Sequence, residues 1–431
     1  MKHSVKEIVL GNGARGLLIN VPGATVMDYE VNFRAGEYLV PREKWEVPHL
    51  MEHVVLGANE KFKKARLFQA EFEKNGAYTN AHTSVVSVGY EAECADFEWD
   101  RILDMLLLSV SKPLFLREEF KAEFGNIKDE LVARSNNHFR TLAISMNEAQ
   151  GLLAMTDRER LKMMKNVRRK DLIEHYERTH TTRNMRFIIA GELKGREAKI
   201  RKALESVQLP QGAERFSLPN ELPLHLSRPA FIARASVKNV YFGINTFALK
   251  RFSNPDMDAL EMVNTMLTAT LHSRILGEAR ERGLVYSMDS GVDVARSHTG
   301  WWFGAQVMVK NAPALFEIIA RELKRVRSGD ISSKDLDAAK QYLLGRHQRS
   351  GQTVGGTMAG YGGRYFFDEV INNYHAIPER IRAVSRERIT KVTKRMFSDK
   401  IGGLGVLTTS PSRRELAEHL NDQIQPLWSS K

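Results

Sequence analysis

The residues best suited to chemistry lie in the segment PHLMEH at positions 48–53. His49 and His53 are four residues apart, so an α-helix would place both imidazoles on one face, one turn apart. Two neutral imidazoles at this spacing can hold Zn²⁺ at about 2.0–2.1 Å. Glu52 lies beside them, where its carboxylate can take a proton from a water molecule and deliver it to a leaving amine. The segment suggests a zinc site with a general base, although H-x-x-E-H also arises by chance.

A catalytic zinc site also needs a third protein ligand and an open fourth position. Apolar residues recur with a helical period in residues 117–131 (REEFKAEFGNIKDEL), which predicts an amphipathic helix. Glu123 and Glu130 are seven residues apart, nearly two full turns, and therefore share a neighbouring face of that helix. From the residues alone, either glutamate can complete the site, and the other would support it.

The elements that position these residues follow an order that occurs twice along the chain. The strand-like segment that starts at Val26 resembles one that starts at Asn239, and the segment around Asn184 resembles the one near Ile401. Because the offsets between such pairs agree to within a few residues, we expect an internal duplication. The expected fold class is α+β, with two similar α/β-sandwich halves in which an antiparallel-rich sheet packs against helices.

The boundaries of the two halves are set by a proline-containing stretch near the midpoint. Residues 209–224 lack a clear period and are expected to form a linker. We therefore expect a zinc-binding catalytic half at 1–208 and a homologous, non-catalytic half at 225–431. A second stretch, 351–363, is rich in glycine, and we expect it to be a flexible connector.

Composition narrows the class of protein. The chain has 431 residues, of which 42% are hydrophobic and 27% charged, so it has enough apolar surface for a folded core. No apolar run approaches the roughly 20 residues of a membrane helix, and no signal peptide is recognisable, so we expect no membrane contact. The lone Cys94 fits a reducing compartment, and we expect a cytoplasmic location. The net charge of +12 comes from basic residues interspersed with acidic ones, so we expect no nucleic-acid partner.

Taken together, these segments resemble the pitrilysin and mitochondrial processing peptidase family of zinc metallopeptidases. H-x-x-E-H is the inverted zincin signature, and Glu130 follows His53 by 77 residues, the spacing of the family's third ligand. Residues 75–84 (NGAYTNAHTS) resemble the strand that pairs with the substrate backbone in this family. Residues 273–288 (SRILGEARERGLVYSM) resemble a segment of the family's second half. The likeness covers most of the chain.

The resemblance implies one Zn²⁺ per chain, held by His49, His53 and Glu130. It further implies that Glu52 acts as general base and that Glu123 is the supporting acidic residue.

The resemblance also assigns roles outside the zinc ligands. Asn80 and Ala81 match positions that bind the substrate backbone, and Tyr286 matches a tyrosine that holds the substrate and its oxyanion. The family places an arginine seven residues before that tyrosine. Here the arginine, Arg280, precedes Tyr286 by six residues, and we assign it the same role.

The implied activity is hydrolysis of peptides or unfolded segments inside a closed chamber of four such units. A chain with two units would then act as a homodimer, and a heterodimer with a related subunit is the other arrangement. The alternative to an active enzyme is a non-catalytic or partner-dependent peptide-binding subunit of the same fold, which the shifted arginine motivates.

Overall fold

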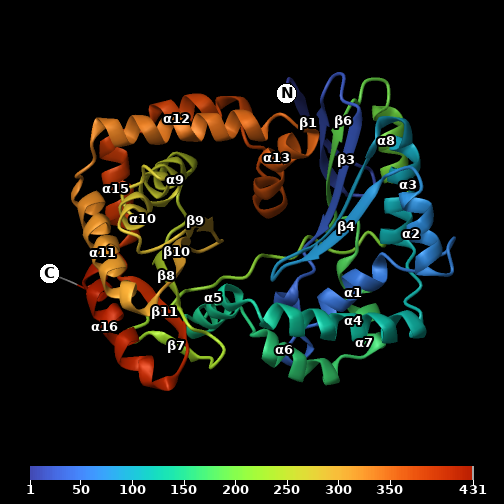
Figure 1. The fold of residues 1–431 in the computed structure, drawn as a ribbon. Coiled ribbons are helices and arrows are strands. Elements are labelled where there is room, and N and C mark those ends of the chain that lie inside the picture. Colours follow the sequence, from blue (N-terminus) through green and yellow to red (C-terminus); the bar gives the residue numbers. More distant parts are fainter. Residues whose placement is uncertain (430–431) are drawn as a thin grey trace. The chain divides into compact units, whose positions relative to one another are not determined.

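The computed structural model describes residues 1–429 and divides into two compact units, each built from three segments of the chain (Figure 1). Unit 1 comprises Met1–Val132, Arg158–Pro219 and Gln348–Tyr374. Unit 2 comprises Ala133–Asp157, Asn220–His347 and the chain from His375 onward. The boundaries expected for the duplicated halves, at 208 and 225, stay a prediction.

Unit 1 contains a six-stranded sheet in the order β1-β2-β6-β3-β5-β4, in which only the β2–β6 pair is parallel. Its strands are β1 (Ser4–Val9), β2 (Arg15–Asn20), β3 (Val26–Phe33), β4 (Tyr78–Thr83), β5 (Val88–Ala95) and β6 (Arg186–Gly191). Its helices are α1 (Val47–Val55), α2 (Ala65–Glu73), α3 (Trp99–Ser111), α4 (Arg117–Ser135), α6 (Asp157–Met163), α7 (Arg169–Thr179), α8 (Glu197–Glu205) and α13 (Val354–Asp368). Strand β4 lies at one edge of the sheet.

Unit 2 contains a five-stranded sheet in the order β7-β11-β8-β10-β9. Its strands are β7 (Ala230–Ala233), β8 (Val240–Ala248), β9 (Met288–Val294), β10 (Thr299–Val307) and β11 (Ile401–Thr408). Its helices are α5 (His138–Ala149), α9 (Asn254–Thr268), α10 (Leu276–Glu281), α11 (Ala312–Ser328), α12 (Ser333–Ser350), α14 (Ile377–Ala383), α15 (Arg386–Met396) and α16 (Arg414–Ile424).

The two sheets share one pairing pattern, which confirms the expected α+β fold of two similar halves. In unit 1, β6 pairs in parallel with β2 and antiparallel with β3, and β5 lies between β3 and β4. In unit 2, β11 likewise pairs in parallel with β7 and antiparallel with β8, and β10 lies between β8 and β9. Strand β8 begins 214 residues after β3, and β11 begins 215 residues after β6.

Each sheet is covered by a helix from the other half of the sequence. Helix α13 packs on β3 and β6, whereas α5 packs on β8 and β11. Glycines let α5 approach its sheet closely, because a Cβ atom at Gly405 would lie 2.4 Å from the Sδ of Met146, and one at Gly243 would lie 2.9 Å away. The close contact therefore depends on residues without side chains.

The expectation of a flexible connector at residues 351–363 was wrong, because most of this stretch belongs to α13. Thr353 caps the helix by accepting a hydrogen bond from the backbone N–H of Gly356. Gly360 lies under the ring of Tyr374, where a Cβ atom would be 2.4 Å from a ring carbon. Tertiary packing therefore outweighs the low helix propensity of glycine here.

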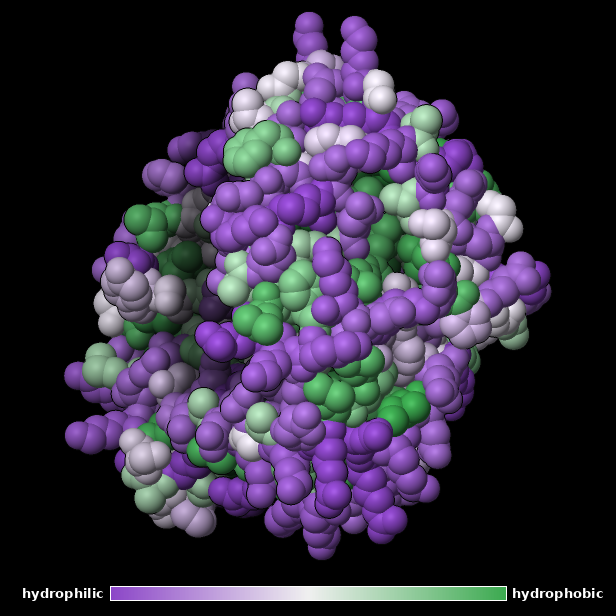
Figure 2. Space-filling model, turned by 90° about the vertical axis from the view of Figure 1, so that its right-hand side faces the viewer, coloured by the Kyte–Doolittle hydropathy of each residue, from purple (hydrophilic) through white to green (hydrophobic). Residues whose placement is uncertain are grey.

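The surface is mainly hydrophilic over the side that carries α2, α3 and α8, with small hydrophobic patches between charged side chains (Figure 2). Within residues 1–429, every helix is too short or too polar to cross a lipid bilayer.

Candidate metal centre

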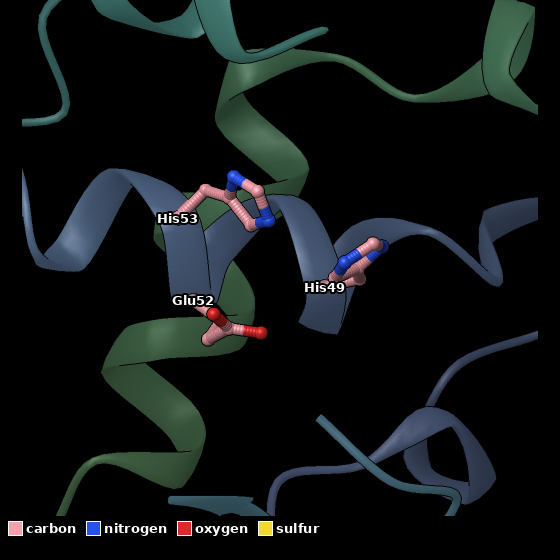
Figure 3. Close-up of side chains that lie close together, drawn as sticks. All are labelled: His49, Glu52 and His53. Carbon is pink, nitrogen blue, oxygen red and sulfur yellow. The ribbon is translucent and has the colours of Figure 1, made fainter. Parts of the chain in front are cut away.

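The H-x-x-E-H segment forms α1, as the sequence predicts, with Pro48 in its first turn. Apolar residues of this helix, among them Leu50 and Met51, are fully buried in the core of unit 1. This packing holds the helix in place, and His49, Glu52 and His53 project from it around one region (Figure 3). Their ligand atoms lie within 4.8 Å of one another, and they are the one such group of His, Cys, Asp and Glu side chains within residues 1–429.

Glu130, on α4, brings a carboxylate oxygen to both histidines. Its Oε2 atom lies 3.4 Å from Nε2 of His49 and 3.8 Å from Nε2 of His53. Ligand atoms about 2.0–2.2 Å from a tetrahedral zinc ion would be about 3.4 Å apart. Two imidazole nitrogens and one carboxylate oxygen are donors that zinc prefers. The donor set therefore fits zinc.

Carboxylates on the far side of both rings orient the histidines. Nδ1 of His49 lies 3.1 Å from Oε2 of Glu46, and Nδ1 of His53 lies 2.9 Å from Oε2 of Glu123. When each Nδ1–H donates to its carboxylate, each Nε2 keeps its lone pair on the side of Glu130. The structure thus places Glu123 behind His53 and Glu130 between the two Nε2 atoms, an assignment that the spacing alone left open.

The sequence patterns did not identify Glu46 as a residue of the site. In the structure its side chain is fully buried. It also accepts hydrogen bonds from Arg160 of α6, with 3.0 Å between Nη2 and Oε2 and a second, shorter contact to Oε1. The available signal was its position three residues before His49, one turn away on a helix. Its partner Arg160 lies 114 residues further along the chain, which no local pattern indicates.

The electrostatics of the centre favour a cation. Burial lowers the pKa of His49, but hydrogen bonds to Glu130 and Glu46 outweigh it and raise that pKa to about 9. The hydrogen bond to His53 lowers the pKa of Glu123. The carboxylates that hold a proton on His49 create a negative potential that would equally attract a metal ion.

Glu52 and the edge strand β4 lie side by side. The hydroxyl of Thr83, the last residue of β4, donates to Oε2 of Glu52 at 2.8 Å. Asn80 lies on the same strand and donates to Oε1 of Glu91 at 3.1 Å, whereas Ala81 packs against the core of unit 1. Because β4 pairs only with β5 within residues 1–429, its outer edge can accept an added strand.

Tyr286 and Arg280 lie together in unit 2, whereas the histidines and Glu130 belong to unit 1. Arg280 donates to the backbone carbonyl of Tyr286 at 2.6 Å, and its guanidinium lies 4.5 Å from the centre of the tyrosine ring. The tyrosine itself is 79% exposed. Their catalytic roles stay a prediction. In the second half, Asn264 lies near the position equivalent to His49, and its side chain accepts a hydrogen bond from Trp301.

The fold and the site define a peptidase-like class of protein, and comparisons with known proteins specify it. Residues 20–174 match the model of the insulinase family, peptidase family M16, and residues 166–343 match that of the M16 inactive domain. The chain belongs to the pitrilysin-like peptidase family M16.

Solved structures and a curated relative agree with this family. A protease from Helicobacter pylori has a TM-score of 0.82 and 15% identity, covering 94% of this chain and 100% of that one. An M16 inactive-domain protein from Pseudomonas fluorescens has a TM-score of 0.82 and 16% identity, covering 94% and 98%. A putative M16-like peptidase from Alicyclobacillus acidocaldarius has a TM-score of 0.79 and 17% identity, covering 95% and 99%. Insulin-degrading enzyme-like 2 of Arabidopsis thaliana is 24% identical over 129 residues, which span 30% of this chain and only 13% of that protein.

Proposed function

We propose that the protein is a zinc-dependent endopeptidase. The observation that carries this proposal is the position of Glu130 Oε2 close to Nε2 of both His49 and His53. When bound, zinc supplies Lewis acidity, which lowers the pKa of a water ligand towards about 7 and polarises a carbonyl group. His49, His53 and Glu130 would hold the ion.

The remaining steps are assigned to side chains of this chain. Glu52, 7% exposed and held by Thr83, takes the proton of the attacking water at a carboxylate oxygen and later gives it to the leaving amine. The outer edge of β4, with Asn80 and Ala81, binds the peptide as an added strand. Burial of Glu52 keeps bulk water away from the proton that it carries.

The assembly and location are part of the same proposal. Resemblance to a family whose enzymes enclose substrates between four units supports a homodimer of this two-unit chain. The substrates would be peptides and unfolded segments. A cytoplasmic location is supported by the lone, buried Cys94.

The decisive variant is Glu52→Gln, which keeps the side chain's size and removes its basicity. We expect the variant to bind zinc like the wild type but to have lost peptide cleavage, because no group remains to accept the proton. Metal analysis of the purified protein measures zinc binding, and a mixed peptide library measures cleavage. Glu177→Gln, on the exposed surface of α7, is the control with the same change of charge. Full cleavage by Glu52→Gln would remove Glu52 as the base.

A second candidate is a non-catalytic, partner-dependent peptide-binding subunit. It is favoured by the engagement of Arg280 with the backbone of Tyr286 and by the match of residues 166–343 to an inactive domain. Turnover of the peptide library by the purified chain alone, loaded with zinc, would exclude this candidate.

A further inference from the structure

Unit 2 contains a cavity of about 640 Å³ beside α5, on the face of the sheet that this helix covers. Strands β8, β10 and β9 form its floor, and α5 forms one wall. Ligand cavities in proteins have volumes of about 300–1,000 Å³ and combine apolar walls with a few polar groups. The lining residues all belong to unit 2, so the cavity contains no residue of the metal centre. Its side chains therefore indicate a ligand of its own.

The floor of the cavity is rich in glycine. Side chains alternate along each strand, so three rows of residues across the strands face α5. In the pairing register these rows are Phe247-Gly300-Asp293, Asn245-Trp302-Gly291 and Gly243-Gly304-Asp289. Four of these nine residues are glycine, and glycine inside a strand often marks the close approach of a ligand or of another group.

Aromatic rings border the cavity above these glycines. A Cβ atom at Gly291 would lie 2.8, 3.0 and 3.1 Å from three atoms of the Trp302 indole, so the indole covers the backbone of β9. Phe139 of α5 and Phe247 of β8 also line the cavity. Trp302 is 36% exposed and Phe139 is 38% exposed, which is unusual for side chains of this size. Both rings are therefore available to stack on a ligand.

Two carboxylates of β9 lie on the same face as the indole. Asp289 and Asp293 are exposed, and neither forms an ion pair within residues 1–429. Arg140 of α5 also lines the cavity, but it is paired with the buried Asp157 through two contacts of 2.9 Å. The cavity therefore has negative charge on its β9 side that no Lys or Arg of the described chain pairs with.

Trp302 and Asp293 are held next to each other. Desolvation raises the pKa of Asp293, whereas the charge of His298 and a hydrogen bond from Trp302 lower it. The hydrogen bond fixes the indole beside a carboxylate. A cation placed there would be attracted by both groups, because tryptophan is the strongest aromatic partner of a cation and a carboxylate forms charge-assisted hydrogen bonds with ammonium. The site therefore favours a positively charged group next to an aromatic surface.

A divalent metal ion does not fit this site. Asp289 and Asp293 are four residues apart on a strand, about 13 Å, so they cannot share one ion. A peptide that pairs as an added strand does not fit either. Such a peptide would lie along the edge of β9, whereas the cavity lies over the face of β8 and β10. A compact molecule that enters from above the sheet matches the cavity better.

We propose that this cavity binds a small molecule that carries an aromatic ring and a protonated amine. The ring stacks on Trp302 beside Phe139, and the ammonium group pairs with Asp293. This ligand is distinct from the peptide substrates of the proposed endopeptidase. Its binding requires neither zinc nor cleavage, so the inference goes beyond the proposed function.

The test compares three indole compounds that differ in charge. Tryptamine is a cation, tryptophol is its neutral alcohol analogue, and indole-3-acetate is an anion. Isothermal titration calorimetry with the zinc-free full chain measures their affinities. We expect tryptamine to bind about tenfold tighter than tryptophol, as a charge-assisted hydrogen bond predicts, and indole-3-acetate to bind more weakly than either.

Two variants locate the site, each with a matched control. Ala143→Trp adds a ring to the cavity from the exposed surface of α5 and should abolish tryptamine binding. Ala149→Trp, at the end of the same helix and outside the cavity, should keep it. Asp293→Asn keeps an acceptor for Trp302 but removes the charge, so it should bind tryptamine and tryptophol equally. Asp337→Asn, on the exposed surface of α12, should retain the tenfold difference.

The inference is overturned if the wild type binds tryptamine no tighter than tryptophol, or if it binds neither compound. Tryptamine binding that survives Ala143→Trp would place the compound elsewhere and would also overturn it. Because Asp293 is exposed, we expect Asp293→Asn and Asp337→Asn to melt at the same temperature, so a lost preference would not reflect unfolding. Peptide cleavage enters none of these measurements, and the inference and the proposed function can therefore fail separately.

Discussion

The carboxylates behind the two histidines should contribute very differently to stability, although they contribute alike to metal binding. Glu46 is fully buried and holds both His49 and the 7% exposed Arg160. Glu46→Gln keeps the side chain's volume but removes its charge, so a buried guanidinium loses a charged acceptor. Breaking a buried pair in this way costs about 3–5 kcal/mol. We expect the lower end, about 3 kcal/mol, because the buried Glu37 also attracts Arg160 electrostatically.

Glu123→Gln is the matched variant. The side chains of Glu123 and His53 are 28% and 27% exposed, so solvent screens this pair. We expect the free energy of unfolding to fall by less than about 1 kcal/mol. Both variants should weaken zinc binding by about 10–100-fold, because each removes the group that orients a ligand histidine.

Two assays separate these contributions. Urea unfolding of the zinc-free proteins, followed by circular dichroism, gives stability without any contribution from bound metal. Competition with a chromophoric chelator gives the zinc affinity of the folded proteins. Equal losses of stability in Glu46→Gln and Glu123→Gln, or an unchanged zinc affinity in Glu46→Gln, would contradict this prediction.

Two further predictions concern stability away from the metal centre. Burial lowers the pKa of His175 to about 4, so the unfolded chain takes up the proton more readily and stability falls as pH drops from about 6.5 to 4. His175→Gln should therefore reduce the loss of unfolding free energy between pH 7 and pH 5 by about 2 kcal/mol. Urea titrations at both pH values measure this loss. An equal loss of unfolding free energy in the variant and the wild type would contradict the prediction. Gly405→Ala should lower stability by about 1–3 kcal/mol through its clash with Met146. Gly125→Ala in α4, where no atom lies within 4 Å of the new methyl, should instead raise stability by about 0.5–1 kcal/mol, and thermal melting that ranks the pair in the opposite order would refute the packing argument.

Local patterns predicted the parts of the site that depend on neighbouring residues. The spacing of His49 and His53 and the apolar period of residues 117–131 predicted two helices, and both form. The duplicated order of strands predicted two similar sheets, because each strand carries its own hydrophobic pattern.

The sequence was insufficient where the deciding contact is distant. Residue types alone could not choose between Glu123 and Glu130, because both lie on one helix and their roles depend on the approach of α1. Arg160 gives no local sign that it pairs with Glu46. The low helix propensity of glycine suggested a connector at residues 351–363. The helix α13 forms there instead because it is stabilised by rings and strands from other parts of the chain, which the local sequence does not reveal.

Each sheet is covered by a helix from the other half of the sequence, α13 in unit 1 and α5 in unit 2, and this arrangement has a consequence for synthesis of the protein. Unit 1 includes residues up to Tyr374, so its sheet cannot acquire its last helix until most of the chain has left the ribosome. During synthesis the face of β3 and β6 that α13 covers would stay exposed for that whole interval. Each half expressed alone would lack one helix of its own core, so a cut between the repeats would yield two incomplete folding units rather than two independent domains.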